Sequence, residues 1–229
     1  MRFLLADTVY AGYVQWLYGQ NPGLGNRSYD EQYRATVAGG FHTASAWAEP
    51  LRKAGHAVLD IWADHVPLQV RWCQENNALD LAMRSADAYR FGTTMVDNNK
   101  GHPWYLDIVA EQVRRFRPDV MVLANIYAFD SRFLAALRGH YGIAIGQHAA
   151  ALPHNDLKGY DVIISSLPNQ VRHFRALGIR SELVKLAFDA RLLGRIERFF
   201  LADFHFASLS FPRERVPFLP SSNLQDIIS

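Results

Sequence analysis

The stretch RPDVMVLANI, residues 117–126, opens the part of the chain that decides the fold. From this stretch onward, short apolar runs alternate regularly with amphipathic segments. The apolar runs predict strands at 119–126, 143–147, 162–165 and 182–186. The segments between them predict helices at 131–139 and 169–177. Because this alternation is typical of a doubly wound parallel sheet with right-handed crossovers, the sequence predicts an α/β, Rossmann-like fold.

The N-terminal stretch provides the start of the same sheet. Residues 2–6 form an apolar run that predicts a buried first strand, and Asp7 and Thr8 mark its end. Residues 9–40 mix aromatic side chains with glycine and asparagine, so we expect an elaborated loop there, with a helical turn at 29–37. Long loops at such a place are often functional.

Residues 43–117 are expected to form the remaining helices and the second strand of the sheet. Their composition predicts a helix at 43–54 and a second strand at 56–62, which give the opening strand–helix–strand unit. It also predicts helices at 66–88 and 103–117, the second of which begins at a proline suited to a first helical turn. The polar stretch 90–101 is expected to be a loop.

Size and charge narrow the class of protein. The 229 residues suffice for one large domain, or for one domain and a fragment of a second. Hydrophobic residues make up 49% of the chain and charged residues 20%, so a large core can form. The 24 basic and 22 acidic side chains are spread along the chain, unlike the concentrated basic residues of nucleic-acid-binding proteins. We therefore expect no nucleic-acid partner.

The cysteine count and the N-terminus bear on cellular location. Cys73 is the only cysteine, so no internal disulfide can form, and sites that need several thiolates, such as zinc fingers and iron–sulfur clusters, are excluded. The apolar run at residues 1–6 is far too short for a signal peptide or a membrane span. We expect a cytoplasmic protein with no membrane span.

The change of pattern near residue 189 suggests a boundary. Residues 1–189 are interpreted as one Rossmann-like domain, and residues 190–229 as a linker helix and tail. The tail contains three prolines and a serine-rich end, and it has no core of its own. One interpretation is that a strand at 203–208 begins a second domain that is missing from this chain. The alternative is a C-terminal extension that packs back on the first domain.

Candidate ligand contacts follow from the expected fold. In open α/β sheets, ligands bind beyond the carboxyl ends of the strands. The residues that follow the predicted strands are therefore the candidates, and they are Asp7, Thr8, Tyr10, Gly12, Tyr127, Asp130, His148, Ser166 and Asn169. We expect these residues to converge on one crevice.

His148 is the most informative of these candidates. It follows a predicted strand and has small neighbours, Gly146 and Ala149 among them, that would let a substrate approach. A neutral imidazole can accept a proton from a sugar hydroxyl, and a protonated one can hold a phosphate. The alternative is a structural histidine whose ring nitrogens are bonded to a loop carbonyl. The residues alone leave both interpretations open.

A glycine pair precedes the helix predicted at 43–54. Free backbone N–H groups and the helix dipole favour an anion at such a place, which makes His42 a candidate ligand contact beside Gly39 and Gly40. Two glycines before a helix also serve a tight turn, and that alternative stays open.

Several aromatic residues lie in the expected 9–40 loop. They are Tyr10, Tyr13, Trp16 and Tyr18. Such side chains can stack on a sugar ring, or they can hold a long loop against the core.

The sequence lacks motifs for metals and nucleotide cofactors. Asp97, His102 and Asp107 follow no helix-face spacing, and we interpret them as solvated or capping residues. Gly-x-Gly-x-x-Gly does not follow the first strand, and Gly-x-x-x-x-Gly-Lys-Ser/Thr does not occur. We therefore expect no metal and no cofactor, and neither a dehydrogenase nor an NTPase.

Several short pieces of sequence occur in an informative order. They are RFLL at 2–5, FHT at 41–43 before Trp47, RPDV at 117–120, IGQH at 145–148 and YDVIISS at 160–166. In this order, over residues 2–189, the chain resembles the N-terminal domain of GT-B glycosyltransferases of families 4 and 1, a group that includes spore-maturation-like transferases.

The resemblance implies a function for the whole domain. In such enzymes the N-terminal domain binds the acceptor, the C-terminal domain binds the nucleotide-sugar donor, and sugar transfer occurs between them. His148 matches a strand-end histidine that faces the transferred sugar, as a base or a stabiliser of the transition state. Tyr10, Gly12 and Tyr13 lie in the loop that closes over the reaction centre. The donor would bind to a second domain missing from this chain, and the acceptor would be a saccharide or another small molecule.

A glutamate pair that is typical of the family is absent from this chain, and its absence leaves other functions open. The paired glutamates at Glu-x7-Glu spacing do not occur in this chain. A non-catalytic module that binds a saccharide, a nucleotide or a protein is the alternative. A small phosphate-ester or nucleotide enzyme with a flavodoxin-like architecture is a third hypothesis, but this chain has no phosphate-binding loop. If a second domain is missing, phenylalanines of the tail lose their cover, and we expect a homodimer through Phe199, Phe200, Phe204, Phe206 and Phe211.

Overall fold

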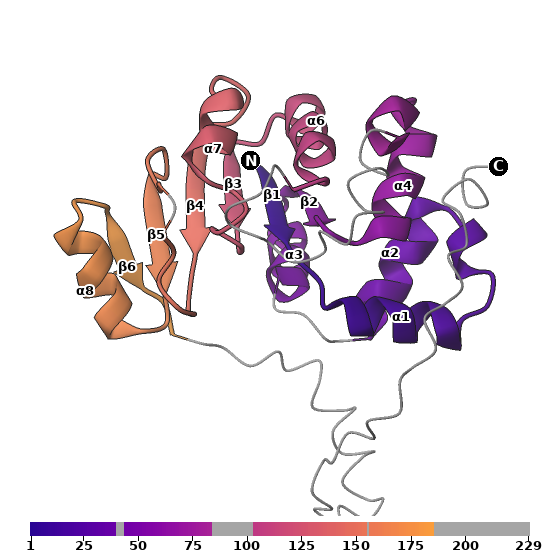
Figure 1. Ribbon diagram of the computed structural model, residues 1–229, viewed down its shortest axis with the longest axis horizontal. Helices are drawn as coiled ribbons and strands as arrows, with labels where there is room; N and C mark the ends of the chain where they lie inside the picture. The colour runs from indigo at the N-terminus through magenta and orange to yellow at the C-terminus, as the bar shows by residue number, and fades with distance from the viewer. Residues whose placement is uncertain (40–43, 84–102, 155, 186–229) are drawn as a thin grey trace, which may run out of the picture. The chain divides into compact units, whose positions relative to one another are not determined.

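A computed structural model of the chain describes residues 1–39, 44–83, 103–154 and 156–185 (Figure 1). The chain divides into two units, Met1–Leu186 and Ala187–Ser229, and every described residue belongs to the first. The helix, strand and dimer contacts expected for the tail therefore lie outside the described residues.

The described unit is built on one parallel sheet of six strands in the order β2-β1-β3-β4-β5-β6 (Figure 1). The strands are β1 (Arg2–Asp7), β2 (Ala57–Trp62), β3 (Val120–Leu123), β4 (Ile143–Gln147), β5 (Val162–Ser165) and β6 (Ser181–Leu183). Every neighbouring pair is parallel. After β1 the chain adds β2 on one side and then β3 on the other, so the order reverses between β1 and β3. In open α/β sheets this reversal marks the place where ligands bind.

Helices connect the strands and cover both faces of the sheet. They are α1 (Ala11–Gln20), η1 (Leu24–Asn26, a 3₁₀ turn), α2 (Tyr29–Ala38), α3 (Ala44–Lys53), α4 (Val66–Glu75), α6 (Leu106–Phe116), α7 (Ser131–Ala136) and α8 (Pro168–Ala176). Leu5 and Val122 pack with Ala48 of α3 on one face. Leu4 and Met121 are fully buried and, by the alternation of a strand, point to the other face. The prediction of an α/β, Rossmann-like, doubly wound sheet is confirmed.

Local chemistry explains where several helices begin and end. Ser28 and Glu31 form a reciprocal capping box at the start of α2, with the Ser28 N–H donating to Glu31 Oε2 at 3.0 Å. The α6 helix ends at Arg117, whose left-handed backbone (φ 49°) directly precedes Pro118. The α3 helix is followed by Gly55 at φ 84°, the expected left-handed residue after a helix.

The expected loop at 9–40 is the main correction to the sequence analysis. It contains α1, the η1 turn and all of α2, so that only the helix expected at 29–37 was foreseen. The side chains that hold these helices together come from separate elements. The Tyr13 hydroxyl donates to the Thr36 carbonyl at 2.6 Å, and the Tyr18 hydroxyl donates to Gln32 Oε1 at 2.6 Å. The stretch is therefore a helical layer rather than a loop.

Several other expected elements are shorter in the structure, and two of them end early for a local reason. The strand expected at 119–126 ends at Leu123, because Asn125 Oδ1 accepts the N–H groups of Tyr127 and Ala128 and turns the chain. The helix expected at 66–88 breaks after Glu75, where Asn77 has a left-handed backbone (φ 52°). Residues 84–88 and the loop expected at 90–101 lie outside the described residues.

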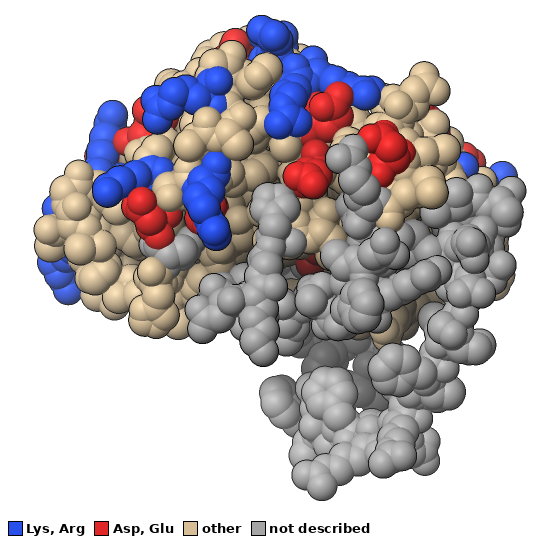
Figure 2. Space-filling model, turned by 45° about the horizontal axis from the view of Figure 1, so that its top comes forward, with Lys and Arg blue, Asp and Glu red and all other residues tan. Residues whose placement is uncertain are grey.

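The surface and the helices of the described unit have two further properties. Figure 2 shows lysine and arginine side chains interspersed with aspartate and glutamate on the face that it presents. In the described stretches, no helix combines the length and the hydropathy that a membrane crossing requires.

Cys73, on α4, is fully buried, and burial raises the pKa of its thiol to about 12.

Candidate functional site

Two carboxylates meet at the carboxyl ends of β1 and β2. Asp7 is the last residue of β1, and its Oδ1 accepts the N–H of Thr8 at 2.8 Å. Asp64 lies two residues beyond β2, and its Oδ1 accepts the N–H of Val9 at 2.6 Å. Both carboxylates are thus fixed by the backbone that leads from β1 into α1. Among the described residues, neither forms an ion pair.

The end of β3 joins the same edge. Asn125, two residues beyond β3, donates from Nδ2 to the Thr8 hydroxyl at 3.4 Å. This bond links the ends of β1 and β3, where the strand order reverses. The arrangement gives hydrogen-bond acceptors from Asp7 and Asp64, and a hydroxyl and an amide from Thr8 and Asn125, at the edge where an α/β sheet binds ligands.

Burial changes the acidity of these carboxylates. Loss of water raises the pKa of Asp7 to about 6, and that of Asp64 to about 6. The negative charge of Asp7 adds a smaller increase to the pKa of Asp64. A carboxylate with a pKa near neutrality can accept a proton from a reacting hydroxyl and release it again, which is the requirement for a general base.

A third carboxylate, Asp60, lies inside β2. It is 3% exposed, and its Oδ2 accepts the Tyr33 hydroxyl at 2.8 Å, while its Oδ1 is buried with no hydrogen-bond partner. Burial raises the pKa of Asp60 to about 6, with a smaller increase from the charge of Asp7. The pKa of Asp60 therefore depends in part on the charge of Asp7, although Asp60 lies within β2 and not at its carboxyl end.

Asp60 and Asp64 were missed by the sequence analysis. The rule that selected Asp7, a polar residue directly after a strand, also selects Asp64 when it is applied to the strand expected at 56–62. The signal for Asp60 is an acid within an otherwise apolar strand, because a buried carboxylate is uncommon and needs a partner.

The four aromatic residues at and directly before α1 differ in whether they are bonded to α2 or exposed. Tyr13 and Tyr18 bond to α2 through their hydroxyls, so they hold the helical layer together. Tyr10 and Trp16 are 71% and 56% exposed. Tyr10 directly precedes α1 and lies three residues from Asp7, and Gly12 is an exposed residue in the first turn of that helix. Of the predicted contacts, Tyr10 and Gly12 are thus exposed on the segment that follows Asp7, while the Tyr13 hydroxyl forms a structural hydrogen bond.

His148 lies at the end of β4, as expected, but its side chain is turned into the structure. It is 3% exposed, and its Nε2 lies 2.8 Å from the carbonyl oxygen of Ala151. A carbonyl oxygen only accepts, so Nε2 carries the proton. Burial lowers the pKa of the imidazole, which favours the neutral ring. The Tyr127 ring packs edge-on against this imidazole, with 5.2 Å between the ring centroids. The Tyr127 hydroxyl also donates to the carbonyl oxygen of Ala151.

The other predicted contacts have separate places in the fold. Asp130 caps α7, where its Oδ1 accepts the N–H groups of Arg132 and Phe133 at 3.0 and 3.1 Å. Ser166 is half-buried directly after β5, and Asn169 is exposed in the first turn of α8. His42 lies outside the described residues. The structure thus brings Tyr127 and His148 together, but it shows no contact that joins Asp130, Ser166 or Asn169 to them.

Metal-binding groups and similarity to known proteins are two further sources of evidence about function. Among the residues that the structure describes, no group of three or more histidine, cysteine or acidic side chains could hold a metal ion. Comparison of the chain with protein-family models, with curated proteins and with solved structures finds no match. Since one α/β fold hosts many activities, the argument for function depends on the side chains at the edge.

Proposed function

We propose that this unit binds a saccharide acceptor and is the acceptor-side half of a GT-B glycosyltransferase. The observation that supports the proposal is the pair of backbone-fixed carboxylates, Asp7 and Asp64. The exposed Tyr10 follows Asp7 by three residues, on the segment that leads from β1 into α1. Carboxylate oxygens accept hydrogen bonds from sugar hydroxyls, and aromatic rings stack on the apolar face of a sugar. Asp7 and Tyr10 both lie on the short segment between β1 and α1, which begins at the edge where the sheet topology favours a ligand.

The proposal has two candidate bases, Asp7 at the carboxylate edge and His148 at the end of β4. Asp7 has a pKa of about 6 and is only partly buried, so it can accept a proton from an acceptor hydroxyl that reaches it. His148 is the base favoured by the sequence resemblance, and it would first have to leave the carbonyl of Ala151. The nucleotide-sugar donor would bind to a second domain, because the described residues provide no second sheet for it.

A non-catalytic saccharide-binding module is the second candidate. The observation that favours it is the bond between His148 and Ala151, which keeps the imidazole away from a ligand. The two candidates share the carboxylate edge and differ in whether a proton is transferred there.

Titration calorimetry of the full chain tests the proposal. We expect binding of oligosaccharides and no tight binding of free nucleotides or nucleotide-sugars. Asp7→Asn and Asp64→Asn together should weaken saccharide binding by at least about tenfold, since each removes a charged acceptor. Asp156→Asn, on an exposed loop, is the matched control and should leave binding unchanged.

The outcomes separate the candidates. Tight binding of a nucleotide-sugar would contradict the acceptor-side assignment. Saccharide binding that survives Asp7→Asn/Asp64→Asn would contradict the proposed edge. With the donor domain supplied, loss of transfer in Asp7→Asn or His148→Ala, at retained saccharide affinity, would support an enzyme. Unchanged transfer in both variants would contradict the two candidate bases.

A further inference from the structure

The hydroxyl of Tyr105 is a buried polar group that has no hydrogen-bond partner among the residues that the structure describes. Tyr105 directly precedes α6 and is only 5% exposed. A buried hydroxyl that has lost its bonds to water and gained none costs free energy, so folded proteins keep few of them. The Tyr105 hydroxyl is therefore a candidate for a bond to a molecule from outside the chain.

Tyr105 lies toward the carboxyl edge of the sheet, where Asp7 and Asp64 are. The α6 helix ends just before β3 begins, so it runs back across the sheet, and its first residues lie toward the carboxyl ends of the strands. The Tyr105 ring also packs edge-on against Phe129, with 6.4 Å between the ring centroids. Phe129 belongs to the loop that follows β3, and Asn125 of the same loop donates to Thr8 at this edge. The course of the chain and the ring contact thus agree on the position of Tyr105.

Asp64 is near enough for its charge to act on the Tyr105 hydroxyl. Burial raises the pKa of Tyr105, and the negative charge of Asp64 adds a smaller increase. The hydroxyl therefore keeps its proton at neutral pH and stays a hydrogen-bond donor. The edge thus has an unpaired donor in addition to the acceptors Asp7 and Asp64.

A donor is what the two carboxylates lack for the recognition of a sugar. An ionised carboxylate only accepts hydrogen bonds, whereas a sugar hydroxyl donates one and accepts others. Asp64 alone can bind the proton of such a hydroxyl, but it leaves the lone pairs of the hydroxyl oxygen unpaired. The O–H of Tyr105 can donate to that oxygen.

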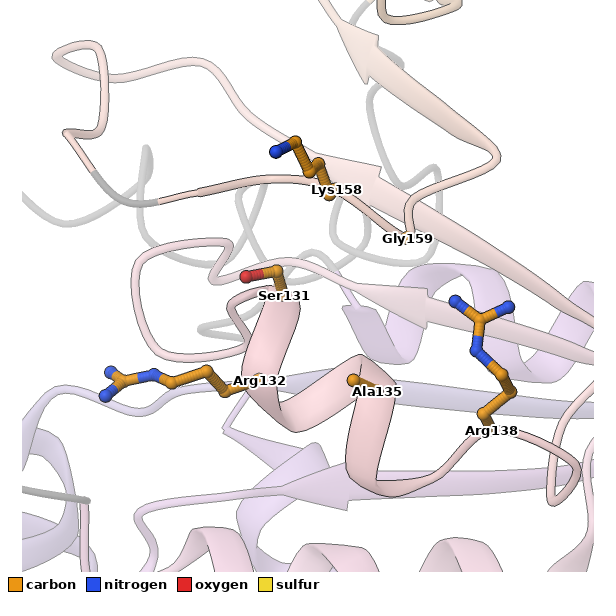
Figure 3. Close-up of a pocket in the computed structure, with 6 residues that line it drawn as sticks. All are labelled: Ser131, Arg132, Ala135, Arg138, Lys158 and Gly159. Atoms are coloured by element: carbon orange, nitrogen blue, oxygen red, sulfur yellow. The ribbon is translucent and has the colours of Figure 1, made fainter.

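The hollow over α7 shows no comparable set of groups (Figure 3). Arg132 and Arg138 line it, but both are exposed, and their side chains extend to opposite sides of the helix. These charged groups do not converge on a common ligand atom. The unpaired donor at the carboxyl edge is therefore the better candidate for a ligand contact.

We propose that Tyr105 donates a hydrogen bond to the same ligand hydroxyl that donates to Asp64. The site would then require a free hydroxyl at one position of the saccharide. It would reject an analogue that lacks this hydroxyl, because the buried groups of the site would be left unpaired. The inference rests on the proposed saccharide binding and adds to it a residue that determines specificity.

Titration calorimetry and thermal unfolding of Tyr105→Phe test the proposal together, with maltotriose, cellotriose, mannotriose and chitotriose as the probes. The substitution removes the hydroxyl and keeps the ring. It should weaken binding of the preferred trisaccharide by about fivefold or more, because one hydrogen bond to the ligand is lost. The melting temperature should stay the same or rise, since the hydroxyl has no partner within the described protein.

Tyr29→Phe is the matched control. The Tyr29 hydroxyl is likewise buried without a hydrogen-bond partner among the described residues, but it belongs to α2 and is affected by the charge of Asp60 rather than that of Asp64. Its removal should leave the affinity for the trisaccharide within about twofold. Equal weakening by Tyr29→Phe and Tyr105→Phe would overturn the proposal, because the effect would not be specific to the edge.

Deoxygenated ligands identify the recognised hydroxyl. Among the monodeoxy analogues of the preferred trisaccharide, one should bind less tightly to the unchanged chain and show no further loss with Tyr105→Phe. This result is expected because the analogue and the variant each remove one half of the same hydrogen bond. Losses that add for every analogue would contradict the proposed bond.

The remaining outcomes separate this inference from the proposed function. If the unchanged chain binds a trisaccharide and Tyr105→Phe binds it equally well, the role of Tyr105 is overturned and saccharide binding stands. A lower melting temperature of Tyr105→Phe at unchanged affinity would also overturn it, because the hydroxyl would then be bonded within the fold. If the unchanged chain binds no trisaccharide, the proposed function fails and the role of Tyr105 fails with it.

Discussion

Asp60 makes the stability of the fold depend on pH. Its pKa is raised from 3.8 to about 6 by burial, so the folded state binds a proton more tightly than the unfolded state does. This contribution to stability is fully present below pH 3.8, declines as the pH rises, and is lost above about pH 6. Asp60→Asn, which stays neutral and can still accept the Tyr33 hydroxyl, should stabilise the fold by about 1–3 kcal/mol at pH 8.

Urea unfolding at several pH values measures this effect. The difference between Asp60→Asn and the unchanged chain should shrink toward pH 4. A loss of stability in Asp60→Asn at pH 8 would instead mean that a neighbouring cation, such as Arg52, depends on the carboxylate charge.

Individual residues of the candidate site differ in how well the sequence predicts their contacts. Asp7 was found because the end of a buried strand can be read from an apolar run. The bond between His148 and Ala151 was offered only as an alternative, since the path of the backbone after β4 decides it. Asp130 illustrates the same difficulty, because a residue after a strand is often also the cap of the next helix.

At the scale of elements, α1 gives a test of the helical layer. Gly12 is exposed in the first turn of this helix, and nothing lies within 4 Å of the position that a Cβ would take. Gly12→Ala should therefore stabilise the fold by about 0.5–1 kcal/mol, because alanine loses less backbone freedom in a helix. Thermal or urea unfolding measures it. Weaker saccharide binding in the same variant would support Gly12 as a place of close ligand approach.

Gly23 provides the contrasting position. It has similar open space around its Cβ position, but its φ is 84°. Gly23→Ala should destabilise the fold by about 1 kcal/mol, because alanine is strained in a left-handed backbone. If Gly12→Ala destabilised the fold as Gly23→Ala is expected to do, the helical assignment of 11–20 would be contradicted.

The elements differ in how well local sequence predicts them. The strands at 143–147 and 162–165 were predicted correctly because interior strands of a parallel sheet are largely apolar and stand out as short apolar runs between helices. The α1 helix was missed because it has no capping side chain and no charged residue in its first or last turn. Its support comes from bonds between Tyr13 and Thr36 and between Tyr18 and Gln32, and local sequence does not reveal such pairs.

At the scale of the whole molecule, the tail can be tested by deletion. All six strands of the sheet end before residue 186, so removal of residues 199–229 should leave the fold intact. From the phenylalanines of the tail we expect the full chain to be a dimer and the shortened chain to be a monomer. Light scattering after size-exclusion chromatography gives both masses. A dimer that persists in the shortened chain would contradict this expectation.

Cys73 gives the molecule a practical property. The only thiol of the chain is fully buried with a pKa of about 12, so it should not react with a maleimide or with Ellman's reagent until the chain unfolds. One cysteine introduced at an exposed position, such as Gln15 on α1, would then be the sole attachment point for a fluorophore or a spin label. A label at this introduced cysteine would test for ligand binding near α1 spectroscopically, with no need to replace Cys73.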